Sequence, residues 1–263
     1  MTVATWRNEH RGVVRVIGST VSIELAALVA LGVTYTFIRA GQGNDAGVAI
    51  AHAHHILSIE GPIFGHLERP LNQWLVGLPA LAVPACYFYA LMHYAVTPTV
   101  LLVSRRSGGW SYWRGYWALM IASAIALVIY ARYPVAPPRL VPDIDVVDVM
   151  RRFASYGWWG SAASAPRGIG DATNQFAAMP SLHFGWSLWC GIQMWGFRSK
   201  LWRIPAIVYP TLQVIVVLGT ANHFFLDVLG GGACVLVAYA VVGALKPFAD
   251  RSPAAEDSPS HVA

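Results

Sequence analysis

The stretch FFLDVLGGGACVLVAYAVVGAL (residues 224–245) is apolar along almost its whole length, yet it carries an acidic side chain, Asp227, near its start. A helix needs about 20 apolar residues to cross the hydrocarbon core of a bilayer. An ionisable side chain within or at the edge of such a span is costly and usually serves a function. The stretch therefore predicts a membrane-spanning helix with a functional site at its beginning.

The composition of the whole chain is typical of a membrane protein. Of its 263 residues, 56% are apolar and only 12% are charged, which is about half the charged fraction of a soluble domain. The net charge of +5 would favour nucleic-acid binding in a soluble protein. Here we assign it to Lys and Arg on cytoplasmic loops, and we expect no nucleic-acid partner.

Six stretches qualify as membrane spans, which predicts an all-α integral membrane protein with six transmembrane helices in a single domain, 1–250. The expected spans are 14–37, 74–103, 116–130, 181–197, 204–218 and 224–245. The polar tail, 251–263, is expected to be a disordered cytoplasmic segment.

Positive charge predicts the orientation of these spans. Most of the 18 Lys and Arg residues lie on the cytoplasmic side if both termini are cytoplasmic. Two long segments, 41–70 and 133–179, are then outside the membrane. The first predicts an interfacial amphipathic helix, and the second is a long loop of the kind that is usually functional. The expected face of that helix consists of Ile50, His54, Leu57, Gly61 and Phe64.

Two histidines and an aspartate are candidate catalytic residues. His223 and Asp227 are four residues apart and so share one helix face. An aspartate there can accept a hydrogen bond from one imidazole nitrogen and leave the other free to attack. His183 follows Pro180 and Ser181 at the start of the fourth span. Because Pro suits the first turn of a helix, we expect an anion-binding helix N-terminus there, with His183 as a proton donor.

Arg132 and Arg139 flank a proline-rich segment after the third span, ARYPVAPPRL (131–140). Two guanidiniums held by a stiff backbone can clamp a phosphate. On the predicted topology both arginines, both histidines and Asp227 lie at the outer ends of their spans. Together they fit phosphoryl transfer: the arginines, Ser181 and the helix amides neutralise charge, His223 attacks, Asp227 orients it and His183 protonates the leaving group. No metal or organic cofactor is required.

These segments resemble the three motifs of the type 2 phosphatidic acid phosphatase superfamily, in the same order. Arg132 and Arg139 match the Lys-x6-Arg-Pro motif, Pro180–His183 matches Pro-Ser-Gly-His, and His223 with Asp227 matches the end of Ser-Arg-x5-His-x3-Asp. The resemblance implies a core of six helices with an outward-facing site. It also implies that His223 is the nucleophile and His183 the acid.

The motifs also depart from that family. Arg132 stands for its lysine, Leu140 for its proline and Leu182 for its glycine, while Val216 and Val217 occupy the positions of the third-motif serine and arginine.

The pattern also resembles the branch of inositol phosphorylceramide and sphingomyelin synthases. The resemblance thus leaves three functions open: a phosphatase of phosphatidic acid or a polyprenyl phosphate, a headgroup phosphotransferase with a lipid or polyol acceptor, or a non-catalytic transport or assembly protein. We favour the phosphatase, in the cell membrane with its site on the non-cytoplasmic face.

Weaker signals lie around the motifs. Asn174 and Gln175 precede the second motif and are candidates for binding a polar headgroup. Glu60 and Glu68 could pair with Arg69 or line the acceptor pocket, but we favour their interpretation as part of a solvated face. The segment after the first span also holds a cluster of histidines whose spacing matches no metal motif, so we expect no metal site: His52, His54, His55 and His66.

Overall fold

The computed structural model describes residues 24, 26–27, 29–34, 46–159 and 175–249. The chain divides into two compact units, Met1–Asn44 and Asp45–Ala263, and everything below concerns the second. The expected tail, 251–263, and most of the expected first span, 14–37, lie outside the described residues.

The second unit is built from helices, and its described part contains no strand beyond an isolated parallel bridge between Val135 and Ala177. The longer helices are α2 (Ala46–Phe64), α3 (Glu68–Val76), α4 (Pro79–Ser107), α5 (Gly109–Arg132), α7 (Leu182–Trp195), α8 (Arg203–Gly219) and α9 (Phe225–Ala249). The shorter ones are η1 (Pro138–Leu140), α6 (Val149–Arg152), η2 (Ala154–Tyr156) and η4 (Lys200–Trp202). The predicted all-α class is confirmed for these residues.

Four of the described helices are long and apolar enough to cross a membrane: α4, α5, α8 together with η4, and α9. They correspond to four of the six expected spans, so the protein is a membrane protein. α7 has 14 residues and is therefore about 21 Å long, shorter than the ~30 Å hydrocarbon core. The arrangement with six spans stays a prediction.

The expected second span, 74–103, begins too early. Trp74 belongs to α3, which ends at Val76 with Gly77 as its C-cap, and Pro79 occupies the first position of α4. Proline suits that position because its missing N–H would have no partner there. The sequence pattern joined α3 to α4 because both are rich in apolar residues.

α2 forms where an amphipathic helix is expected, but its buried face is shifted by about one position. The buried residues are Ala49, Ala53, Ile56 and Glu60, whereas His54 is exposed. Small alanines let α2 pack closely, and they carry little signal in a hydrophobicity pattern. The placement of α2 at the membrane interface stays a prediction.

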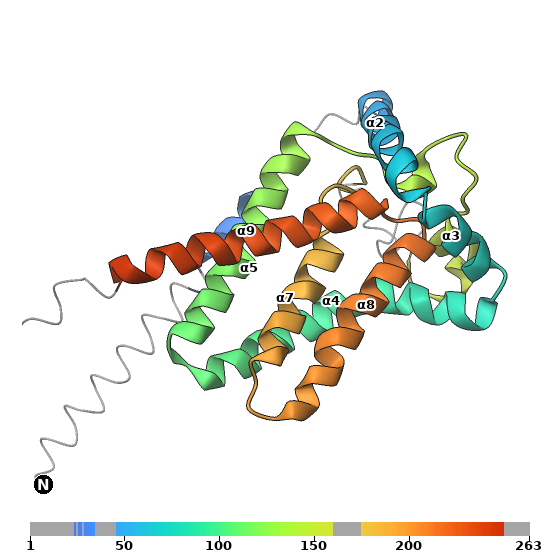
Figure 1. Cartoon of the computed structure of the whole chain (residues 1–263). Helices are drawn as coiled ribbons and strands as arrows, with labels where there is room; N and C mark the ends of the chain where they lie inside the picture. The colour runs from blue at the N-terminus through green and yellow to red at the C-terminus, as the bar shows by residue number, and fades with distance from the viewer. Residues whose placement is uncertain (1–23, 25, 28, 35–45, 160–174, 250–263) are drawn as a thin grey trace, which may run out of the picture. The chain divides into compact units, whose positions relative to one another are not determined.

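α7 lies at the centre of the helical bundle, where it packs against α4, α5, α8 and α9 (Figure 1). Glycines allow the start of α9 to approach the start of α7: a Cβ atom on Gly231 would clash with the carbonyl oxygen of Ser181. This approach lets the amide of Ser181 donate to the carbonyl oxygen of Asp227 at 2.8 Å. The second and third sequence motifs are thereby joined through their backbones.

Candidate active site

His223 lies in the turn before α9, and its side chain is 5% exposed. Its Nδ1 lies 2.8 Å from the carbonyl oxygen of Ala178 and 3.4 Å from Oδ2 of Asp227. Because a carbonyl oxygen only accepts hydrogen bonds, Nδ1 carries the proton in this arrangement. Nε2 is then the unprotonated nitrogen, and it makes no hydrogen bond within the described residues.

Asp227 is fully buried at the start of α9. Its Oδ2 accepts a hydrogen bond from the amide of Phe224 at 2.8 Å, which satisfies one of the free donors at a helix N-terminus. Asp227 therefore supports the turn that carries His223 and also faces the imidazole. The carbonyl of Ala178, which the sequence did not point to, makes the shorter contact with that imidazole.

His183 faces His223 with 5.9 Å between the ring centroids. Its imidazole stacks on Tyr89 at 4.2 Å and meets the edge of His93 at 4.4 Å, so α4 fixes the orientation of the ring. Nε2 of His183 is buried and lacks a hydrogen-bond partner in the described part of the chain. The motifs did not point to His93, although a histidine inside an apolar span was a usable signal.

The start of α7 differs from the expected arrangement. Pro180 is not in the first turn: the helix begins at Leu182, and Ser181 is its N-cap. The Oγ of Ser181 accepts from the amide of Phe184 at 3.3 Å, as serine commonly does at that position. The amide of Leu182 interacts with the hydroxyl of Tyr130. The amide of His183 has no hydrogen bond in the described structure, which leaves one donor at a helix N-terminus.

The two candidate arginines differ in their surroundings. The Nε of Arg139 donates to Oδ1 of Asn222 at 2.9 Å, and its Nη1 lies 3.5 Å from a carboxylate oxygen of Asp148. Arg139 is thus held beside the residue that precedes His223. Arg132, at the end of α5, is exposed and makes no hydrogen bond or ion pair with the described residues.

The position of the absent third-motif arginine is occupied by Val217, which is fully buried. Its carbonyl oxygen accepts from the amides of Asn222 at 3.0 Å and His223 at 3.2 Å. The backbone at this position therefore still supports the turn before α9. Asn222 is a further residue that sequence reasoning missed, and its place beside His223 was the available signal.

The remaining predicted residues are less closely connected to the site. Gln175 is half-buried, and Asn174 lies outside the described residues. His52 and His55 bind the segment after α5: Nδ1 of His52 is 2.8 Å from the carbonyl oxygen of Pro134, and Nδ1 of His55 is 2.9 Å from the hydroxyl of Tyr133. Among the described residues, no group of three or more His, Cys, Asp or Glu is placed to hold a metal ion.

Glu60 and Glu68 contradict the interpretation as a solvated face. Glu60 is 0% exposed and Glu68 is 2% exposed, and Oε2 of Glu60 accepts from the amide of Leu226 at 2.8 Å. The interpretation was wrong because α2 packs against the start of α9, where Glu60 binds the amide of Leu226 and Glu68 lies beside Glu60.

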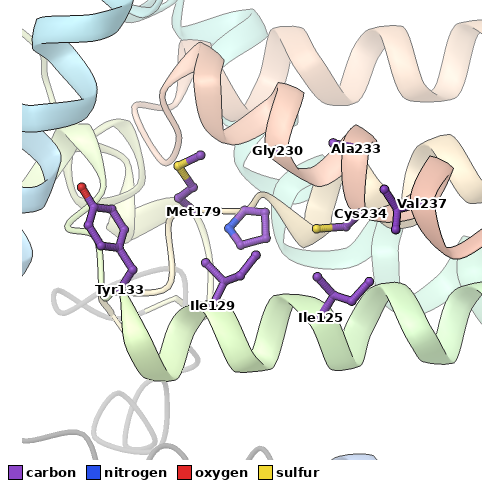
Figure 2. A pocket seen from close by; sticks show the side chains of 9 residues that line it. Ile125, Ile129, Tyr133, Met179, Gly230, Ala233, Cys234 and Val237 are labelled. Atoms are coloured by element: carbon purple, nitrogen blue, oxygen red, sulfur yellow. The ribbon is translucent and has the colours of Figure 1, made fainter.

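An apolar pocket of about 350 Å³ lies between α5 and α9 (Figure 2). Its lining is Ile125, Ile129, Tyr133, Met179, Pro180, Gly230, Ala233, Cys234 and Val237. The pocket adjoins the histidines through the backbone, because Met179 and Pro180 lie between Ala178, which contacts His223, and Ser181, which caps α7. The hydroxyl of Tyr130 fixes this segment by donating to the carbonyl oxygen of Pro180 at 2.6 Å.

Comparison with protein-family models agrees with the motifs. Residues 54–241 match the model of the PAP2 superfamily, so the chain belongs to the type 2 phosphatidic acid phosphatase superfamily. The matched range covers α3 to α8 completely and holds all three motifs. Comparison with curated proteins and with solved structures found no match. Membership indicates phosphatase or phosphotransferase activity on phosphate esters.

Proposed function

We propose that the protein is a membrane phosphatase that hydrolyses the phosphate ester of a lipid, of the phosphatidic acid or polyprenyl phosphate class, through a covalent phosphohistidine. The observation that carries the proposal is the pair of imidazoles, His223 and His183, that face each other at 5.9 Å. His223 has a free Nε2 and a fixed tautomer, as a nucleophile requires. His183 is held by the aromatic contacts with α4, so its position as a proton donor does not depend on His223.

In the first half-reaction, Nε2 of His223 attacks the phosphorus atom. The N–P bond forms while the P–O bond to the lipid breaks, and His183 gives a proton to the departing oxygen. The lipid alcohol leaves, and the proton stays on Nδ1 of His223, which donates it in a hydrogen bond to the carbonyl oxygen of Ala178 beside Asp227.

In the second half-reaction, a water oxygen attacks phosphorus from the side that the lipid has left. His183 now accepts a proton from this water, the N–P bond breaks, and inorganic phosphate is released. Both proton transfers are at the same imidazole, which returns to its starting state after each cycle.

In this proposal, arginine side chains and a backbone amide bind the phosphoryl oxygens. Arg139 is held by Asn222 and Asp148 with its Nη2 unused by the described residues, and the amide of His183 is open at the start of α7. Arg132 is exposed and would have to turn toward the site when substrate binds. Such donors stabilise charge that develops during phosphoryl transfer.

The pocket between α5 and α9 supports a lipid substrate. It is lined entirely by apolar side chains apart from Tyr133, and its volume of about 350 Å³ is within the range of small-molecule sites. A hydrocarbon chain in this pocket would enter from the membrane and keep the phosphate near Pro180 and Ser181. We place the site at the non-cytoplasmic face of the cell membrane, as the positive charges predict.

A headgroup phosphotransferase is the second candidate, and one observation favours it. Val217 replaces an arginine with a buried apolar side chain, as expected if the chain has departed from the common phosphatase pattern. The chemistry changes only in the second half-reaction, where an alcohol replaces water as the attacking group.

The experiment uses protein purified in detergent without divalent metal, given phosphatidic acid and polyprenyl phosphates with and without added inositol. Free phosphate and new lipid species are followed together in wild-type protein and in His223→Ala. Phosphate release that disappears in the variant supports the phosphatase. A new phospholipid that requires the alcohol supports the transferase. Equal turnover in the variant contradicts a phosphohistidine.

A further inference from the structure

Two buried glutamates lie beside the site without a part in the chemistry above. Glu60, near the end of α2, is 0% exposed, and Glu68, the first residue of α3, is 2% exposed. Burying a carboxyl group is costly unless hydrogen bonds or charges compensate for the lost solvation. Both groups therefore need a structural or functional reason.

A tight turn brings the two carboxyl groups together. Gly65 has φ of 72° and His66 has φ of 56°, both in the left-handed region, so the chain turns sharply between α2 and α3. Gly61 makes room for this turn, because a Cβ there would lie 2.6 Å from Nε2 of His66. In the resulting arrangement the side chain of Glu68 hydrogen-bonds to Glu60, and Nδ1 of His66 lies 3.9 Å from Oε1 of Glu68.

Glu60 connects this turn to the site. Its Oε2 accepts from the amide of Leu226, just as Oδ2 of Asp227 accepts from the amide of Phe224. Two carboxyl groups, from α2 and from α9 itself, thus accept from the amides of Phe224 and Leu226 at the start of a 25-residue helix. The partial positive charge at a helix N-terminus favours this, and Leu226 directly precedes Asp227.

Glu68 retains its proton to a higher pH than an exposed glutamate does. Burial, the hydrogen bond with Glu60 and the negative charges of Glu60 and Asp227 raise the pKa of Glu68 to about 8. A protonated Glu68 donates to Glu60, so near neutral pH Glu68 adds no negative charge of its own next to Asp227. The titratable groups that face Glu68 are Glu60, Asp227 and His66.

We propose that Glu60 is a positioning residue for the reaction: it fixes the first turn of α9 and thereby the place of Asp227 against His223. Glu68 supports it by donating a hydrogen bond to its carboxylate. The inference rests on the proposed function, because it assigns Glu60 an effect on the nucleophile of that reaction.

The test compares Glu60→Ala, Glu60→Gln and Glu68→Gln with wild type. Asp143→Asn is the matched control, because Asp143 is an exposed carboxylate that makes no hydrogen bond or ion pair with the described residues. We expect Glu60→Ala to lower kcat about 10- to 100-fold, as small displacements of catalytic groups do, with little change in KM. Glu60→Gln keeps an oxygen acceptor for Leu226 and should recover most of the loss. Asp143→Asn should behave as wild type.

The pH profile separates positioning from a merely structural role. Wild-type kcat should fall as the pH rises through about 8, where Glu68 loses its proton, and Glu68→Gln should remove that fall. The inference is contradicted if the loss of kcat in Glu60→Ala equals the fraction of unfolded protein at every pH. It is also contradicted if Glu60→Ala has the same kcat as wild type.

Binding of orthovanadate, an analogue of the transferring phosphoryl group, gives a readout without a known lipid. We expect no binding to His223→Ala and weakened binding to Glu60→Ala. Wild-type affinity in Glu60→Ala beside loss in His223→Ala overturns only the role of Glu60. Unchanged binding in His223→Ala, or none in wild type, overturns the proposed function together with it.

Discussion

The Nδ1 of His223 and the carbonyl oxygen of Ala178 lie 2.8 Å apart, which joins the turn before α9 to the segment before α7. This contact fixes the imidazole independently of Asp227, whose Oδ2 is 3.4 Å from the same nitrogen. The orientation of the proposed nucleophile is therefore shared between a backbone carbonyl and a carboxylate.

Asp227→Asn tests this sharing. We expect kcat to fall by about 10²- to 10³-fold, less than the roughly 10⁴-fold that a carboxylate solely responsible for a tautomer can cost. In this variant the carbonyl oxygen of Ala178 still orients the imidazole of His223. Turnover of a lipid phosphate by purified protein measures the effect, with His223→Ala as the reference for complete loss. Activity in Asp227→Asn as low as in His223→Ala would show that Ala178 does not suffice.

The two arginines should differ in their effects. Arg139 is fixed by Asn222 and Asp148, so Arg139→Lys, which loses the planar guanidinium, should lower kcat/KM by about 10²-fold or more. Arg132 is exposed, so Arg132→Lys should cost about tenfold or less. Steady-state kinetics on one lipid phosphate checks both variants. The reverse order would mean that Arg132 carries the main phosphate contact.

The pocket predicts a dependence on the hydrocarbon chain. Ala233→Phe should narrow the space lined by Cys234 and Met179 and raise KM for long-chain lipid phosphates about tenfold. Hydrolysis of a short, soluble phosphate ester should be unaffected. Leu236→Phe is the control, because Leu236 is exposed on the same helix outside the pocket. Equal effects of Ala233→Phe on both substrates would place the lipid chain elsewhere.

Thermal stability should depend on pH through Glu68. Its pKa is raised from 4.5 to about 8 in the folded protein, so the folded state holds a proton that the unfolded state releases between these values. The stabilisation is complete below about pH 4.5 and is lost as the pH rises to about 8. Melting curves in detergent should show this trend in wild type and a weaker one in Glu68→Gln. The same slope in both proteins would contradict a retained proton on Glu68.

The proximity of the candidate catalytic residues could be predicted from the sequence, but most of the contacts that hold them could not. His223, Asp227 and His183 stand out because ionisable groups are rare in apolar spans, and the structure brings them together. The contact with Ala178 involves a backbone atom, which leaves no mark on residue identity. Glu60 was misread because its burial depends on the left-handed turn at Gly65 and His66, which only the folded chain reveals.

The same distinction holds for the fold. Long apolar stretches predicted α4, α5, α8 and α9, since length and hydropathy are properties of the sequence itself. α7 was expected as a span over 181–197, yet the structure gives it 14 residues. α7 packs against α4, α5, α8 and α9, and hydropathy does not separate burial among helices from contact with lipid.

The most direct test of the central claim is the capture of the phosphorylated enzyme. Wild-type protein is mixed with a lipid carrying a radioactive phosphate, quenched within milliseconds to seconds, and digested to locate the label. We predict label on His223, stable in alkali and released by acid, and no labelled protein in His223→Ala. Turnover by wild type with no labelled protein at any time, or label that persists in His223→Ala, would contradict a phosphohistidine at this residue.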